Sequence, residues 1–148
     1  MTKREKVYLK YNGKCAYTGK ILDDKWQIEH VHPKCLKIQS YHLIEHHDHI
    51  DNLLPALWIV NHYKRSLNLE QFREYMRYFN KRLAKLPKNT SVERTKKRKE
   101  YMYKVADAFD ITIDKPFSGK FYFETVPYNI PISEVLDKIK EKDEYWSK

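Results

Sequence analysis

The first thirty residues change between apolar and polar positions over short distances, a pattern that predicts short elements. Residues 3–11 favour a short helix that ends at the Asn-Gly turn pair of residues 12–13. Residues 16–22 and 26–30 have the composition of short strands, and an Asp-Asp pair separates them. These two segments therefore predict a hairpin-like unit.

The middle of the chain predicts a long loop followed by a helix. Residues 34–51 show neither the period of a strand nor that of a helix, and we interpret them as a loop. Residues 55–65 fit a helix with Pro55 in its first turn, although their apolar stretch also suits a strand. Their context favours the helix.

The second half of the chain predicts mainly helices. Asn68 and Gln71 have the spacing of a capping box, and the apolar positions after them predict a helix that continues through Phe79 and ends before Pro87. Residues 91–109 predict another helix, with a basic beginning and an apolar end. We assign the aromatic residues of these helices to the core and not to base stacking.

The last segments predict a strand and a helix. Residues 120–125 fit a strand with Phe121 and Phe123 on one face, and residues 131–140 fit a short helix. With no internal repeat and no low-complexity linker, the elements predict an α+β fold in a single domain over residues 1–148.

Charge is the first indication of a partner. The chain has 29 Lys and Arg against 20 Asp and Glu, and the net charge of +9 favours a polyanion, although a merely soluble basic protein has the same balance. No run of about 18 apolar residues occurs, so we expect a cytoplasmic protein with no membrane partner. Cys15 and Cys35 are expected to be free thiols.

The histidines place the candidate chemistry in the first half. All seven lie between residues 30 and 62. His42, His46, His47 and His49 form a cluster, but their spacing matches no closed set of metal ligands, and a solvated polar loop is the favoured interpretation.

Three short motifs follow one another in this half. They are Glu-His-Val-His-Pro at residues 29–33, Asp-Asn-Leu-Leu-Pro at 51–55 and Asn-His-Tyr-Lys at 61–64. Nine positions separate Asn52 from Asn61. In order and spacing, the three motifs resemble the signature of the HNH nucleases.

The resemblance implies a ββα-metal core, consisting of a β-hairpin and a metal-binding helix, at about residues 13–67. It implies a helical C-terminal extension with a short strand over about residues 68–148. Residues 13–17 and 66–73 are similar to a phage and bacterial subfamily, which implies the cytoplasm of a bacterial or phage-infected cell.

The implied function is metal-dependent hydrolysis of phosphodiester bonds in DNA, with duplex DNA contacted mainly through its backbone. Two alternatives stay open. A catalytically silent DNA-binding or phage accessory protein would keep the same fold, although the intact motifs argue against it. An RNA-directed nuclease would use the same phosphate chemistry.

Each need of this reaction has a candidate residue. His30 is suited to take a proton from water, because an unperturbed imidazole titrates close to neutral pH. The resemblance implies that Glu29 and Asn61 bind one Mg²⁺ or Mn²⁺ ion and that Asn52 orients His30, although Asn52 also suits a simple turn or cap. Neighbouring strand residues point to opposite faces, so Glu29 and His30 share a site only in a distorted strand, which the resemblance implies.

Two further histidines are candidates for an accessory metal or active-site role. His62 follows Asn61 by one residue and lies about 100° away from it on a helix, so only one of them can face the metal squarely. Asn61 is the favoured ligand. His32 is equally suited to line the active site or to pack.

Basic residues in two places are candidates for contacts with phosphate groups of DNA. Lys64 and Arg65 either clamp phosphates beside the cleaved bond or form an exposed basic helix end. The block of Lys96, Lys97, Arg98 and Lys99 either contacts phosphates or is a solvated helix end.

One departure from the family pattern concerns a structural zinc ion. Related sequences carry two CxxC pairs, and the matching positions here are Cys15, Thr18, Leu57 and Val60. A single thiolate cannot form the closed four-ligand site that structural zinc requires. We therefore expect no structural zinc and a small hydrophobic cluster in its place.

Overall fold

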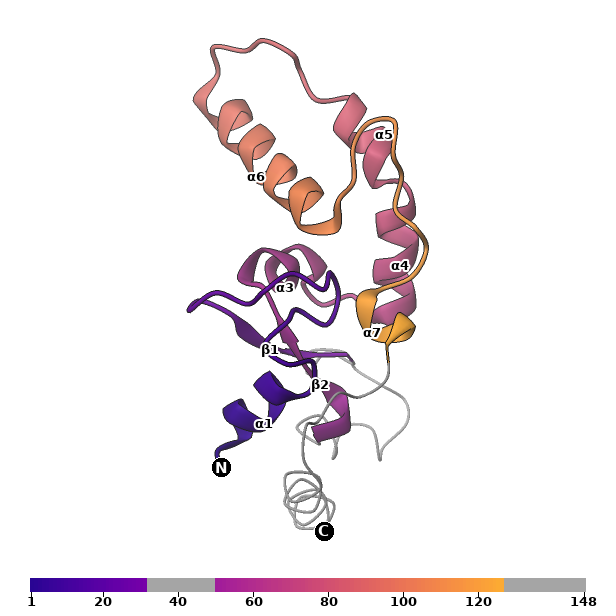
Figure 1. Cartoon of the computed structure of the whole chain (residues 1–148). Helices are drawn as coiled ribbons and strands as arrows, with labels where there is room; N and C mark the ends of the chain where they lie inside the picture. The colour runs from indigo at the N-terminus through magenta and orange to yellow at the C-terminus, as the bar shows by residue number, and fades with distance from the viewer. Residues whose placement is uncertain (32–49, 127–148) are drawn as a thin grey trace.

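The computed structural model describes residues 1–31 and 50–126, whose arrangement is shown in Figure 1. In chain order the elements are α1 (Lys3–Leu9), β1 (Gln27–His30), the 3-10 turn η1 (Ile50–Asn52), β2 (Leu53–Ala56), α3 (Trp58–Lys64), α4 (Leu69–Arg77), α5 (Phe79–Ala84), α6 (Glu93–Phe109) and α7 (Tyr122–Thr125). A two-stranded antiparallel sheet with several helices confirms the predicted α+β class. The sheet lies between α1 and α3, and α6 packs on α3 (Figure 1).

The sheet pairs β1 with a segment other than the predicted one. The pairing of residues 16–22 with 26–30 is wrong, because β1 pairs antiparallel with β2, and His30 stands opposite Leu53. Residues 16–18 instead form a turn, and Ile21 forms an isolated antiparallel bridge with Lys14, next to which the Cys15 amide donates to the Lys20 carbonyl at 2.7 Å. The four residues of β2 are all buried, which explains why they lack the polar alternation of a half-exposed strand.

The predicted place of Pro55 in the first turn of a helix is wrong, because Pro55 belongs to β2. It stands opposite Ile28, and its carbonyl accepts a hydrogen bond from the Ala16 amide at 2.8 Å. A strand with a single ladder partner tolerates a proline, because no second ladder needs its missing N–H group. The apolar run after residue 52 is therefore first strand and then helix, and α3 begins only at Trp58.

The helices with local end signals form where the sequence predicts them. Asn68 accepts from the Gln71 amide at 2.9 Å, and the Gln71 side chain accepts from the Asn68 amide at 3.0 Å, so the capping box is confirmed. The helix is interrupted at Tyr78, whose φ of −100° and ψ of 6° separate α4 from α5. The predicted helices at the N-terminus and over residues 91–109 are confirmed as α1 and α6.

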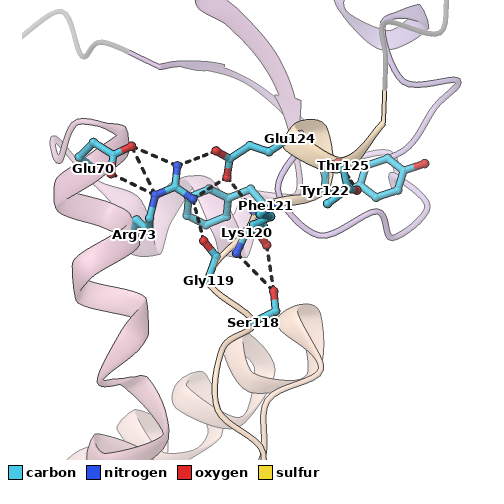
Figure 2. Close-up of polar contacts among 9 residues, drawn as sticks. All are labelled: Glu70, Arg73, Ser118, Gly119, Lys120, Phe121, Tyr122, Glu124 and Thr125. Atoms are coloured by element: carbon cyan, nitrogen blue, oxygen red, sulfur yellow. Dashed lines mark hydrogen bonds and ion pairs between the residues drawn. The ribbon is translucent and has the colours of Figure 1, made fainter.

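The strand predicted at residues 120–125 is wrong, because Tyr122–Thr125 form the short helix α7. Figure 2 shows the contacts that position it. Arg73 of α4 donates to both carboxylate oxygens of Glu124, at 2.6 and 2.7 Å, and to the Gly119 carbonyl at 2.8 Å. The Phe121 ring is fully buried and stacks on Phe72 at 5.4 Å. These tertiary contacts outweigh the local preference for a strand.

The core joins both halves of the chain. The buried ring of Tyr17 contacts Phe72 edge-on at 5.7 Å and Phe121 at 5.1 Å. Residues 13–67 and residues 68–126 therefore share one apolar cluster. The helix predicted at residues 131–140 lies outside the described residues.

Candidate functional site

Two pairs of side chains connect α3 to β1. The Asn61 amide nitrogen donates to the Gln27 side-chain oxygen at 2.5 Å, and the Lys64 ammonium lies 2.6 Å from a carboxylate oxygen of Glu29. Gln27 and Glu29 share one face of the strand because side chains alternate, while Asn61 and Lys64 are neighbours three residues apart on the helix. The spacing of all four residues therefore fits a helix lying along the strand.

Lys64 holds the end of β1 from the protein interior. Its side chain is 0% exposed, and its ammonium also donates to the carbonyls of His30 at 3.1 Å and Val31 at 3.3 Å. These two carbonyls and the Glu29 carboxylate provide one acceptor for each of the three N–H groups of the ammonium. The predicted phosphate contact of Lys64 is therefore wrong for this arrangement, as is the alternative of an exposed helix end.

A second buried lysine holds the chain where β2 begins. Lys10 is fully buried, and its ammonium donates to the carbonyls of Ile50 at 2.5 Å and Leu53 at 2.7 Å. The Val31 amide donates to the Asn52 carbonyl at 2.9 Å. Val31 and Asn52 are therefore held together, and Asn52 lies beside the end of β1 that carries His30.

His30 and Glu29 occupy opposite faces of β1. The strand is regular over residues 27–30, with Glu29 buried and His30 half-buried at its last position. The local distortion that the family resemblance implies is absent, and the alternation of a regular strand prevails. His30 therefore reaches the surface at the strand end, whereas Glu29 lies in the interior.

Each carboxylate oxygen of Glu29 has a partner within the protein. One lies beside Lys64, and the other accepts a hydrogen bond from the Tyr17 hydroxyl at 2.5 Å. Burial raises the pKa of the Glu29 carboxyl, and the Lys64 charge and the two hydrogen bonds offset part of this effect. Burial, together with the Glu29 charge, also raises the pKa of Tyr17 well above its usual value.

The residues described do not fit a divalent cation at Glu29. Only 2% of its side chain is exposed, and the Lys64 ammonium beside it would repel a second cation. Asn61 is bonded to Gln27, and within residues 1–31 and 50–126 no group of three or more His, Cys, Asp or Glu side chains could hold a metal ion. The predicted ligands Glu29 and Asn61 therefore do not meet His30 in one metal site here.

His62, one of the two accessory candidates, contacts aromatic residues at the surface. His62 is exposed, and its Nδ1 lies 2.6 Å from the Tyr101 hydroxyl. Its ring stacks on Trp58 at 5.0 Å. These contacts, with α6 and with the first residue of α3, leave His62 outside the α3–β1 interface. His32 lies outside the described residues.

The other basic candidates lie at the surface. Arg65 is exposed directly after α3, and Lys96, Lys97 and Arg98 are exposed on the first turns of α6. Lys99 is partly buried, and its ammonium donates to the Lys88 carbonyl at 2.7 Å. Lys99 is therefore less available to a phosphate group than its neighbours.

The four positions that the HNH resemblance compares with zinc ligands lie in or against the core. The Cys15 thiol is buried and forms hydrogen bonds with the Thr18 side chain and the Leu57 backbone. Burial raises the pKa of this thiol, and the hydrogen bonds partly offset the rise. Val60 is fully buried beside them in the same cluster. The small hydrophobic cluster predicted at these positions is therefore present, with Leu57 packed against the buried residues.

Three residues of the site were not predicted from the sequence. Gln27 had a usable signal, since it precedes Glu29 by two residues and so shares its face of a strand. Tyr17 and Lys10 had none, because their partners lie 12 to 43 residues away.

Comparisons of the chain with models of known families, with curated proteins and with solved structures found no match. Among residues 1–31 and 50–126, no helix has the length and apolar character needed to cross a membrane.

Proposed function

We propose that this protein is an endonuclease of the HNH type, which hydrolyses phosphodiester bonds in DNA with His30 as general base. The observation that supports this most is the order of β1, β2 and α3, with His30 at the end of β1 and Asn61 and Lys64 facing that strand. A net charge of +9 adds support for a polyanionic substrate.

The proposed chemistry needs a neutral imidazole at a fixed place. His30 accepts a proton from a water molecule as the water oxygen attacks phosphorus, and the P–O bond to the leaving oxygen breaks. The leaving oxygen then takes up a proton from solvent. Lys64 supports this role indirectly, because it binds the His30 carbonyl and so fixes the backbone that carries the base.

A divalent cation, Mg²⁺ or Mn²⁺, is the expected cofactor of this class of enzyme. We assign no step to it, because Glu29 is held by Lys64 and Tyr17 and the described residues form no complete ligand set. The dependence of cleavage on the cation is therefore a matter for experiment.

A second candidate function follows from the same burial of Glu29. A nucleic-acid-binding accessory protein without catalysis could keep the ββα arrangement while an ion pair replaces the metal ligand. The two candidates share the basic surface and differ only in whether a bond is broken.

A plasmid assay separates the two. Supercoiled DNA is incubated with Mg²⁺ or Mn²⁺, with and without EDTA, using the wild type, His30→Ala and the exposed-site control Lys115→Ala. Cleavage by the wild type and the control that is lost in EDTA and in His30→Ala, with DNA binding retained, supports the nuclease. Binding without cleavage supports the accessory protein. Cleavage that persists in His30→Ala would exclude the proposed base.

A further inference from the structure

The first residue of α3 is an exposed tryptophan, Trp58. Trp58 keeps 43% of its surface exposed, although its indole ring stacks on the imidazole of His62 with centroids 5.0 Å apart and planes at 24°. The two residues are four positions apart on the helix, the spacing at which side chains lie one above the other. Part of the indole therefore stays open to solvent while His62 restricts its position.

Tyr101 of α6 holds His62 in turn. The Tyr101 hydroxyl lies 2.6 Å from His62 Nδ1, and its ring meets the imidazole edge-on at 5.4 Å and 80°. Tyr101 also packs against the buried Tyr63, with ring centroids 6.1 Å apart. The exposed indole is thus connected to the core through the rings of His62 and Tyr101. Because its position is already restricted, it loses little conformational freedom when it binds a flat ligand.

Exposed basic residues lie near Tyr101, which supports this stack. Arg65 is exposed three residues after His62 and acts electrostatically on the Tyr101 hydroxyl, whose pKa burial raises and Arg65 lowers in part. Lys97 and Lys104 are exposed on α6, four residues before and three residues after Tyr101, so they lie on its side of the helix. An aromatic ring bordered by cations suits a base with phosphates on either side of it.

We propose that Trp58, supported by His62 and Tyr101, binds an unpaired nucleobase of a nucleic-acid strand by stacking, while Arg65 and Lys97 contact the flanking phosphates. Only an unstacked base can offer its face to the indole, so the site selects single-stranded DNA or a locally opened duplex. The inference rests on the proposed nucleic-acid substrate and adds where a single strand is held.

Binding of a fluorescein-labelled oligo-dT strand and of a blunt duplex of equal length tests the proposal by anisotropy. Trp58→Ala should weaken binding of the strand about tenfold or more, the size expected when one base–aromatic stack is removed. Duplex binding should change less than twofold, and Trp58→Phe should restore most of the loss. The control is Tyr103→Ala, which removes an aromatic side chain of α6 that is 42% exposed. Thermal melts of each variant verify folding.

The outcomes separate this inference from the proposed function. Equal binding of the strand by wild type and Trp58→Ala overturns the stacking site, whatever the plasmid assay shows. Equal losses for strand and duplex also overturn it. Self-association of the wild type that Trp58→Ala abolishes, with strand binding unchanged, would assign the surface to a second copy of the chain. A wild type that binds no nucleic acid overturns both proposals.

Discussion

The ammonium of Lys64 and a carboxylate oxygen of Glu29 lie 2.6 Å apart, and the two side chains are 0% and 2% exposed. The pair joins the C-terminal end of α3 to the third residue of β1 in a region closed to water. Removing one partner from such a pair leaves a buried charge without compensation, whereas removing both does not. This asymmetry makes the structural role of Lys64 measurable.

Lys64→Met should lower the free energy of unfolding by about 3–5 kcal/mol, because Glu29 would keep a buried carboxylate and the carbonyls of His30 and Val31 would lose their donor. The double variant Lys64→Met/Glu29→Gln should recover part of that loss. Urea unfolding measures both values. Arg65→Met is the matched control and should change stability by less than about 0.5 kcal/mol, because its side chain is exposed. A Lys64→Met variant as stable as the control would contradict the buried pair.

Binding of duplex DNA should depend on Arg65 and not on Lys64, which is the reverse of their expected effects on stability. Arg65→Gln should reduce the magnitude of the slope of log K against log salt by roughly 0.9, the effect of releasing one phosphate group. Lys64→Gln should leave that slope unchanged, because its ammonium is buried among protein oxygens. Titrations at several salt concentrations, on variants shown to be folded, provide the comparison. A reduced slope in Lys64→Gln would return this residue to the DNA interface.

Acid should weaken the attachment of α7. Arg73 lowers the pKa of the Glu124 carboxyl below its usual value near 4.5, so the ion pair stabilises the fold fully above that pH. The contribution disappears as pH falls through the lowered pKa and the carboxyl takes up a proton. Glu124→Gln should therefore cost about 1–2 kcal/mol at neutral pH and little at pH 2. Unfolding curves of wild type and variant across this range measure the difference, and a constant difference at all pH values would contradict the ion pair.

Purified protein should contain far less than one zinc ion per chain. Thr18, Leu57 and Val60 offer no thiolate at the positions that the HNH resemblance compares with zinc ligands, and the Cys15 thiol is buried and hydrogen-bonded. Elemental analysis of protein prepared without a His-tag measures the content. One zinc per chain that survives EDTA would show that other side chains supply the missing ligands.

The parts of the fold that the sequence predicts are those with local signals. The capping box of Asn68 and Gln71 determines the start of α4 from residues three positions apart. The partner of β1 had no such signal, because β2 lies more than twenty residues further along the chain and is buried at every position. The segment of α7 alternates like a strand, and its helix is held by contacts with Arg73 and the Phe72 ring and by backbone hydrogen bonds to Ala16 and Tyr17.

The candidate site was predictable in position and not in orientation. The family resemblance implied a helix that carries Asn61 and Lys64 beside the strand that ends in His30, and these two residues contact Gln27 and Glu29 of that strand. Whether Lys64 points to solvent or to the interior depends on Glu29, 35 positions earlier in the chain, and no local pattern encodes that choice. The strand period alone predicted opposite faces for Glu29 and His30, and the regular β1 agrees with the period.

The basic block at the start of α6 permits a last test. We propose a variant in which Gln replaces Lys96, Lys97, Arg98 and Lys99. For duplex DNA, the magnitude of the slope of log K against log salt should fall by roughly 0.9 for each phosphate group that the variant no longer binds. We expect the effect to come from the three exposed residues, because the Lys99 ammonium already donates to the Lys88 carbonyl. A Lys99→Gln single variant should therefore leave the slope unchanged and serves as the internal control.

The same quadruple variant separates binding from chemistry. The block lies on α6, whereas His30 belongs to β1, so its removal should raise KM while kcat at saturating DNA changes little. That combination is the mark of binding energy used equally in the ground state and the transition state. An unchanged salt slope would identify the block as a solvated helix end and leave Arg65 as the principal phosphate-binding residue among the basic residues tested. A fall in kcat without a change in KM would mean that α6 reaches the reacting phosphate, since only interactions made in the transition state alter kcat alone.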